Sequence, residues 1–194
     1  MTGQIKAKGN IQSLLNWSSG CVEWCFNGLF QGCSSLLSVP ALPATELATG
    51  CYHAMFYECT SLTSAPPLPL KTLANNCYQG MFSYCTSLKS APALPATTLA
   101  DSCYNGMFGY CTSLTDAPYL PATELKDWCY HAMFYNCTKL SSINVAFTDW
   151  NYYLATQIWV ENVASTGVFI KPTALSTELG LSRIPSGWTV YNKE

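Results

Sequence analysis

The chain has 194 residues, of which 49% are apolar and only 10% are charged, and its net charge is −2. The apolar fraction is sufficient for a packed core and argues against disorder throughout. This length favours one domain with small flanking pieces. Because the chain has no excess of positive charge to attract phosphate groups, we expect no nucleic-acid partner. Because its apolar runs are far shorter than the roughly 18 residues of a membrane span, we expect no membrane insertion.

The N-terminal segment precedes any repeated pattern. Its first six residues contain no apolar region of the kind found in a cleavable secretion signal. We therefore expect either a chain that is used without classical secretion, as in a phage-encoded protein, or a fragment of a longer protein. Residues 1–24 include the apolar Ile11, Leu14 and Trp17, and this composition favours an N-terminal cap over the repeats that follow.

Residues 25–140 repeat with a period of 26. One cysteine column comprises Cys25, Cys51, Cys77, Cys103 and Cys129, and a second comprises Cys33, Cys59, Cys85, Cys111 and Cys137. Columns of Leu or Met, of Phe, of Leu and of Pro follow the same period. A 26-residue unit is too small to bury a core of its own, so the units must stack on one another.

Each repeat has two halves. In the first half, Leu73, Cys77, Met81 and Cys85 are spaced by four, which predicts the apolar stripe of a short helix. The second half is extended, but its two aligned prolines cannot donate to a parallel ladder, so we expect only three or four residues of strand, near 62–65. Stacking then predicts an α/β architecture with a narrow parallel sheet on one face and short helices on the other.

The period stops after Leu140, and residues 141–194 are expected to form a C-terminal α+β cap. We predict a short helix over 155–163 and strands over 167–171 and 188–191.

The recurring sequence M-F-x-x-C-T-S-L, followed by a proline-rich stretch, resembles the BspA-type leucine-rich repeats, in which Ala usually stands where this chain has Met. The resemblance covers residues 25–140 and implies a leucine-rich-repeat-like, right-handed solenoid of about five coils with caps that do not repeat. The flanking segments are also similar to those of such arrays in anaerobic gut bacteria and their phages. The resemblance implies a non-enzymatic protein of a cell surface or virion that serves in adhesion, in partner binding or as a virion component.

The eleven cysteines allow three interpretations. Equivalent cysteines of adjacent coils lie close enough for disulfides, although columns of five cannot pair completely. A metal site is disfavoured because the C-x7-C spacing matches no zinc motif and because His53 and His131 lie three coils apart. Reduced, buried thiols in the apolar core are favoured, because free Cys behaves as a small apolar side chain.

No catalytic motif is present, and the Cys51 and His53 side chains would lie on different faces of a helix. We therefore expect no enzymatic activity, no cofactor and no metal.

Two surfaces are candidates for ligand binding. The first is the tyrosine column Tyr52, Tyr78, Tyr104 and Tyr130, which could bind sugar rings or a partner's side chains. The favoured alternative is that these tyrosines pack the coils, because a position that repeats in every coil usually serves the stacking. The second is the outward face of the strands, whose residues differ from coil to coil, as expected of a surface that determines specificity. The alternative is that this face is ordinary solvated surface. It comprises Thr63, Ser64, Lys89, Ser90, Thr115, Asp116 and Tyr119. The expected partner is a protein or glycan on a cell or virion surface. The alternative is a purely structural module that associates with itself or with a larger assembly such as a phage particle.

Overall fold

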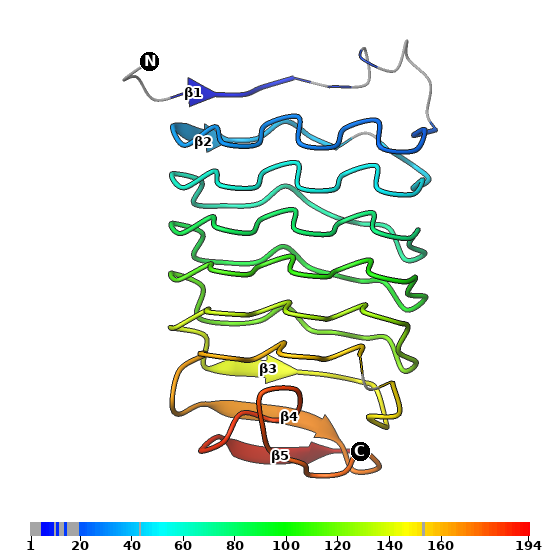
Figure 1. The fold of residues 1–194 in the computed structure, drawn as a ribbon, viewed down its shortest axis with the longest axis vertical. Helices are drawn as coiled ribbons and strands as arrows, with labels where there is room; N and C mark the ends of the chain where they lie inside the picture. The colour runs from blue at the N-terminus through cyan, green and yellow to red at the C-terminus, as the bar shows by residue number, and fades with distance from the viewer. Residues whose placement is uncertain (1–4, 10, 12–13, 15–19, 43, 153) are drawn as a thin grey trace.

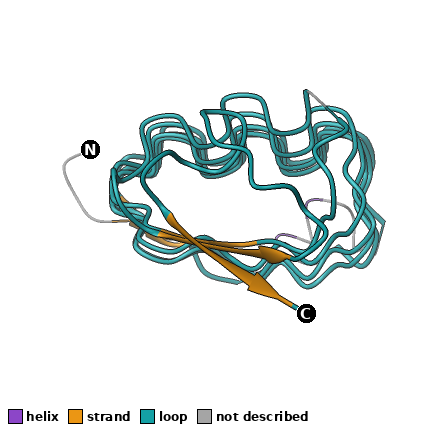
Figure 2. Cartoon of the chain, turned by 90° about the horizontal axis from the view of Figure 1, so that it is seen from below, coloured by secondary structure: helices purple, strands orange, loops and turns teal. Residues whose placement is uncertain are grey.

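The computed structural model describes residues 5–9, 11, 14, 20–42, 44–152 and 154–194. Successive coils of the chain lie one beneath another along the long axis of the molecule (Figure 1). Each coil has an undulating, turn-rich half on one side and an extended half on the other (Figure 2). Residues 26 apart lie side by side in neighbouring coils, and the ring centroids of Phe56 and Phe82 are 5.6 Å apart.

The described strands form two small parallel sheets. They are β1 (Ile5–Lys6), β2 (Leu36–Ser38), β3 (Ser142–Asn144), β4 (Val168–Pro172) and β5 (Thr189–Lys193). Strand β1 pairs with β2, and β3, β4 and β5 form a sheet in that order. The strands predicted over 167–171 and 188–191 are confirmed to within two residues by β4 and β5.

Between these sheets, the extended halves of the middle coils are joined only by isolated parallel bridges. Ser64 pairs with Ser90, and Asp116 pairs with Ser142. The predicted parallel pairing is present, but the strand predicted near 62–65 is reduced to a bridge. Pro66 follows this bridge and has no N–H to donate, so the ladder cannot lengthen.

The predicted helices are wrong, because no α-helix occurs among the described residues. The turn-rich halves form what we term the turn ladder, residues 24–33, 50–59, 76–85, 102–111, 128–137 and 154–163. In the turn ladder, successive N–H groups donate alternately to a carbonyl of the same coil and to a carbonyl of the next coil. The His53 N–H donates to the Gly50 carbonyl three residues before it (3.0 Å), whereas the Tyr52 N–H donates to the Cys77 carbonyl in the next coil (3.0 Å).

Every fourth residue of the turn ladder has a positive φ, which an α-helix of L-residues excludes. The angles at Gly50, Ala54 and Glu58 are 61°, 50° and 60°. The resulting four-residue repeat directs pairs of side chains inward. Cys51, Tyr52, Met55, Phe56 and Cys59 are therefore all buried. The spacing of four correctly placed Leu73, Cys77, Met81 and Cys85 inside, but it arises from successive turns rather than from a helix.

The positive φ of Ala54 leads to a prediction about stability. Gly28, Gly80 and Gly106 occupy the equivalent position in other coils, so a glycine fits there. Because the left-handed conformation is strained for alanine, Ala54→Gly should raise the free energy of unfolding by about 1 kcal/mol. Urea denaturation measures this change. Ala74→Gly, at a position without positive φ, should instead lower stability, and a loss of stability in both variants would contradict the prediction.

The stacking does not stop at Leu140. The Tyr130 N–H donates to the Ala155 carbonyl (2.8 Å), and the buried Trp159 ring lies 6.3 Å from the Phe134 ring. The loop that follows β4 closes this coil, since the Leu181 and Arg183 carbonyls accept hydrogen bonds from the Val160 N–H and the Trp159 Nε1–H. Residues 141–194 thus add another coil and a short sheet, and the helix predicted over 155–163 is a turn segment.

Half of the predicted N-terminal cap, residues 1–24, lies outside the described residues, including Trp17. Within the described part, Ile11 is buried in the core and Leu14 is exposed. No helix of the described chain is long and apolar enough to cross a membrane.

Candidate functional site

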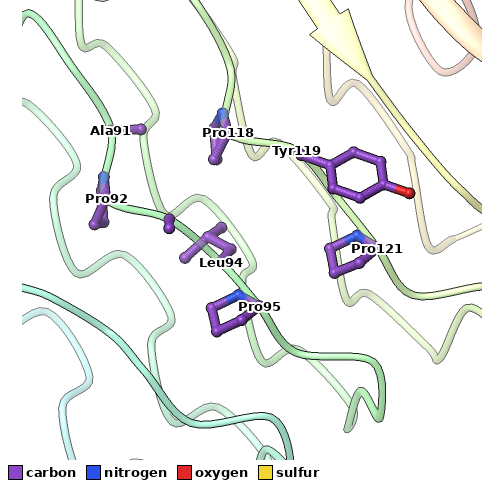
Figure 3. Close-up of a pocket in the computed structure, with 8 residues that line it drawn as sticks. Ala91, Pro92, Leu94, Pro95, Pro118, Tyr119 and Pro121 are labelled. Atoms are coloured by element: carbon purple, nitrogen blue, oxygen red, sulfur yellow. The ribbon is translucent and has the colours of Figure 1, made fainter.

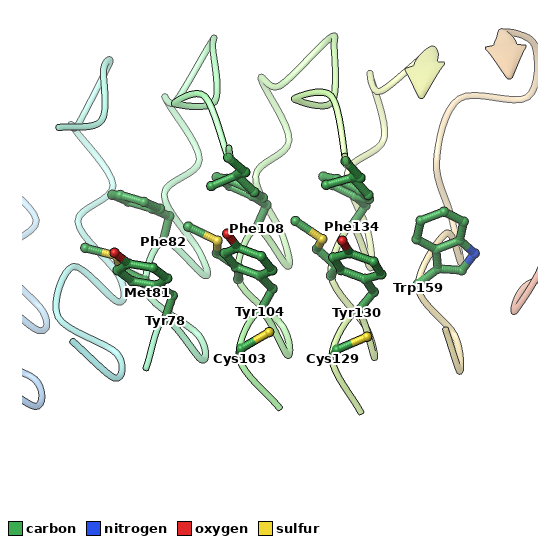
Figure 4. Close-up of a cluster of buried hydrophobic side chains, with 14 of the residues drawn as sticks. Tyr78, Met81, Phe82, Cys103, Tyr104, Phe108, Cys129, Tyr130, Phe134 and Trp159 are labelled. Carbon is green, nitrogen blue, oxygen red and sulfur yellow. The ribbon is translucent and has the colours of Figure 1, made fainter. Parts of the chain in front are cut away.

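The tyrosine column is part of the core. The rings of Tyr52, Tyr78, Tyr104 and Tyr130 are stacked with centroids 5.9 to 6.0 Å apart. Figure 4 shows three of them, Tyr78, Tyr104 and Tyr130, in successive coils. None of the four residues is more than 2% exposed, and burial raises the pKa of each phenol. Side chains buried in this way cannot contact a ligand, so their prediction as a binding surface is wrong. In this column, each tyrosine ring packs against the equivalent ring of the next coil and so holds the coils together.

A second, partly exposed row of tyrosines lies along one edge of the turn ladder. The rings of Tyr84 and Tyr110 are stacked with centroids 4.1 Å apart, and Tyr57 and Tyr135 flank them with tilted rings. The two central rings cover each other's faces, so this row offers a ligand mainly ring edges and hydroxyl groups.

The cysteines are free thiols, and those of the central coils are buried. Thiols of the second column connect neighbouring coils, because the Cys59, Cys85 and Cys111 thiols each donate to a Phe carbonyl of the coil before, at 3.1 Å. Burial raises the pKa of Cys59 to about 12. The second column therefore has a structural role, as small apolar side chains with a hydrogen-bond donor.

Both histidines pair with asparagines of the preceding coil. His53 Nδ1 lies 2.9 Å from Asn27 Oδ1, and His131 Nδ1 lies 3.2 Å from Asn105 Oδ1. Burial lowers the pKa of both imidazoles. Across the described residues, no group of three His, Cys, Asp or Glu side chains is arranged to hold a metal ion.

The predicted strand-face residues are exposed along successive coils: Thr63, Ser64, Lys89, Ser90, Thr115, Asp116 and Tyr119. Among these side chains, Thr115 Oγ1 donates to Asp116 Oδ2 at 2.7 Å.

A shallow apolar groove lies beside these residues. One part has a volume of about 550 Å³ and is lined by Ala91, Pro92, Ala93, Leu94, Pro95, Pro118, Tyr119 and Pro121 (Figure 3). The adjoining part, of about 380 Å³, is lined by Ala65, Pro67, Leu68, Pro69, Pro92, Ala93 and Pro95. Because the two parts share Pro92, Ala93 and Pro95, they form one feature across neighbouring coils, which we term the proline groove.

Tyr119 closes one end of the proline groove and is 48% exposed. Lys193 Nζ, from β5, lies 4.3 Å from the centre of its ring and donates to Asn144 Oδ1 at 2.7 Å. This cation–π contact holds the ring against the last sheet and places a positive charge at the end of the groove.

Of the groove residues, sequence reasoning named Tyr119 as a candidate, at a variable position that Pro67 and Ala93 occupy in other coils. The aligned prolines were considered only as interruptions of a strand. Their recurrence every 26 residues was nevertheless the available signal, because prolines in one register of stacked coils must form a continuous apolar surface.

No protein-family model matches the chain, and neither a curated protein nor a solved structure shows significant similarity to it.

Proposed function

We propose that this protein is a non-enzymatic binding and adhesion module. In this proposal the stacked coils form a right-handed solenoid of leucine-rich-repeat type, and the proline groove attaches it to a protein or glycan on a bacterial cell surface or phage virion. The observation that carries the proposal is the proline groove itself, with the exposed Tyr119 at its end. Proteins usually bind their ligands at concave, mostly apolar sites.

The lining of the proline groove favours a protein segment over a glycan. Its walls are proline rings, alanine methyl groups and the side chains of Leu68 and Leu94, with a single aromatic ring. Such walls bury the apolar side chains of a partner, whereas a glycan requires several hydrogen-bond donors and flat aromatic faces. The charge of Lys193 beside Tyr119 would further favour a segment with an acidic or carbonyl group at this end.

The test is selection of ligands from a displayed peptide library and, in parallel, on a glycan array. Tyr119→Ala should weaken the binding of a selected peptide by about tenfold or more, as expected for an aromatic anchor. Tyr152→Ala is the matched control, because this exposed tyrosine does not line the groove and its loss should leave the affinity unchanged. Equal affinity of the Tyr119→Ala variant, or binding to glycans alone, would contradict the groove assignment.

A second candidate, a structural module that packs into an assembly, is favoured by the distribution of exposed apolar side chains. Apart from Tyr119, the large exposed hydrophobic residues among the described ones lie towards the two ends of the chain: Ile5, Leu14, Val22, Trp24, Leu29, Tyr152, Leu179, Leu181 and Tyr191. Other copies or partners that pack against the two ends of the stack would cover these side chains.

A further inference from the structure

Strand β5 is the last strand of its sheet (Figure 1). The Thr189 N–H donates to the Gly167 carbonyl, and the Lys193 carbonyl accepts from the Thr173 N–H. In a parallel pair, alternate residues bond to the same neighbour. Thr189, Tyr191 and Lys193 therefore bond towards β4. The N–H and C=O groups of Val190 and Asn192 point the other way, where no described residue pairs with them.

The exposed edge of β5 lacks several of the features that usually prevent strand pairing. Proteins protect edge strands with proline, an inward-pointing charge, a bulge or a covering loop. The interior of β5 reads Val190-Tyr191-Asn192 and contains neither proline nor charge, and its register with β4 is regular. Its one charged residue, Lys193, is held by Asn144 and by the ring of Tyr119.

We propose that β5 is a dimerisation edge that pairs with β5 of a second copy of this chain in antiparallel orientation. The positions of the free groups determine the register. Val190 of one copy exchanges both backbone hydrogen bonds with Asn192 of the other, which places the two Tyr191 residues opposite each other at the two-fold axis. The two three-stranded sheets then form one continuous sheet with a self-complementary interface.

The side chains are compatible with this register. Tyr191 is 56% exposed, so its ring is free to pack against its counterpart, and aromatic pairs directly opposite each other stabilise antiparallel strands. Thr189 faces Lys193 of the other copy, so no like charges meet. This proposal uses a different surface from the proline groove and does not depend on the function assigned to the groove.

The test is sedimentation velocity of the full chain over a range of concentrations. We expect a dimer for the wild type and a monomer for Tyr191→Lys, because two ammonium groups would then meet at the two-fold axis. Tyr191→Glu alone should also be monomeric, whereas an equimolar mixture of the two variants should restore a dimer. A wild type that stays monomeric at every concentration, a dimer that persists in Tyr191→Lys, or open-ended polymers would each overturn the proposal.

Cross-linking tests the register. Cysteines introduced as Tyr191→Cys should form a disulfide between copies on mild oxidation, because a directly opposed pair has the Cα separation that a disulfide requires. Thr189→Cys is the matched control on the same face of the strand, and it should not cross-link, since it faces Lys193. Equal cross-linking of both variants would overturn the register. Circular dichroism of each variant shows whether the chain remains folded.

Discussion

The folded protein should lose its stability abruptly in mild alkali. Burial raises the pKa of Cys77, Cys129 and Cys137 to about 12, and it also raises the pKa of the Cys85, Cys103 and Cys111 thiols. In the unfolded chain these thiols ionise near their ordinary pKa of about 8.5. The unfolded state thus binds fewer protons than the folded state above that pH, and stability must fall as the pH rises.

The expected effect is large because the thiols act together. About one pH unit above the ordinary thiol pKa, each buried thiol contributes a loss of about 1.4 kcal/mol, so the central thiols together contribute about 8 kcal/mol. A typical domain has a total stability of about 5–15 kcal/mol. Below the ordinary thiol pKa this contribution is fully present, so acidification does not remove it.

The measurement is the urea midpoint as a function of pH, with a phosphine reductant present to keep the thiols reduced. We expect a constant midpoint from about pH 7 to 8 and a steep fall from about pH 9. Cys111→Ala removes one buried thiol and should make the fall measurably shallower. A midpoint that is unchanged up to about pH 10 would show that these thiols are not buried as the structure places them.

Phe82→Ala should destabilise the protein by about 3–5 kcal/mol, the usual cost of removing a buried aromatic side chain. Phe82 is fully buried, and its ring lies nearly parallel to those of Phe56 and Phe108, at 5.6 and 5.8 Å. Its loss interrupts a column of rings that runs through the core, where each coil is stabilised mainly by its two neighbours.

The free energy of unfolding in urea measures this loss. Phe82→Leu retains part of the buried volume and should cost clearly less, and the surface substitution Tyr119→Ala should change stability by no more than about 0.5 kcal/mol. Similar losses for Phe82→Ala and Tyr119→Ala would contradict the placement of the phenylalanine column.

Hydrogen bonding explains why the second cysteine column contains Cys rather than another small side chain, which packing alone does not explain. Alanine would fill most of the space at Cys85, but it could not donate to the Phe56 carbonyl as the thiol does. Serine could donate, but it would bury a more polar group. A thiol combines apolar character with a weak donor, so it suits a position that repeats in every coil.

The proline groove and the β5 edge differ in how far the sequence could predict them. Tyr119 was a candidate because it departs from the Ala or Pro of the other coils, and the structure places it at the end of the groove. The contact of Lys193 with Tyr119 joins residues 74 positions apart, and no local pattern predicts it. The free backbone groups of Val190 and Asn192 likewise became evident only when the sheet order was known.

The apolar composition of the 194-residue chain and its 26-residue period determined by themselves that coils stack and that the repeated Cys, Met, Phe and Leu side chains lie inside. A unit of that size has no other way to bury Cys, Met, Phe and Leu. Only the tertiary structure decided the backbone of the turn ladder. A residue such as Tyr52 donates its N–H to Cys77 in the next coil, so hydrogen bonds between coils replace those of a helix. Tertiary structure also decided that the tyrosine column is core, because the stacking covers both faces of every internal ring.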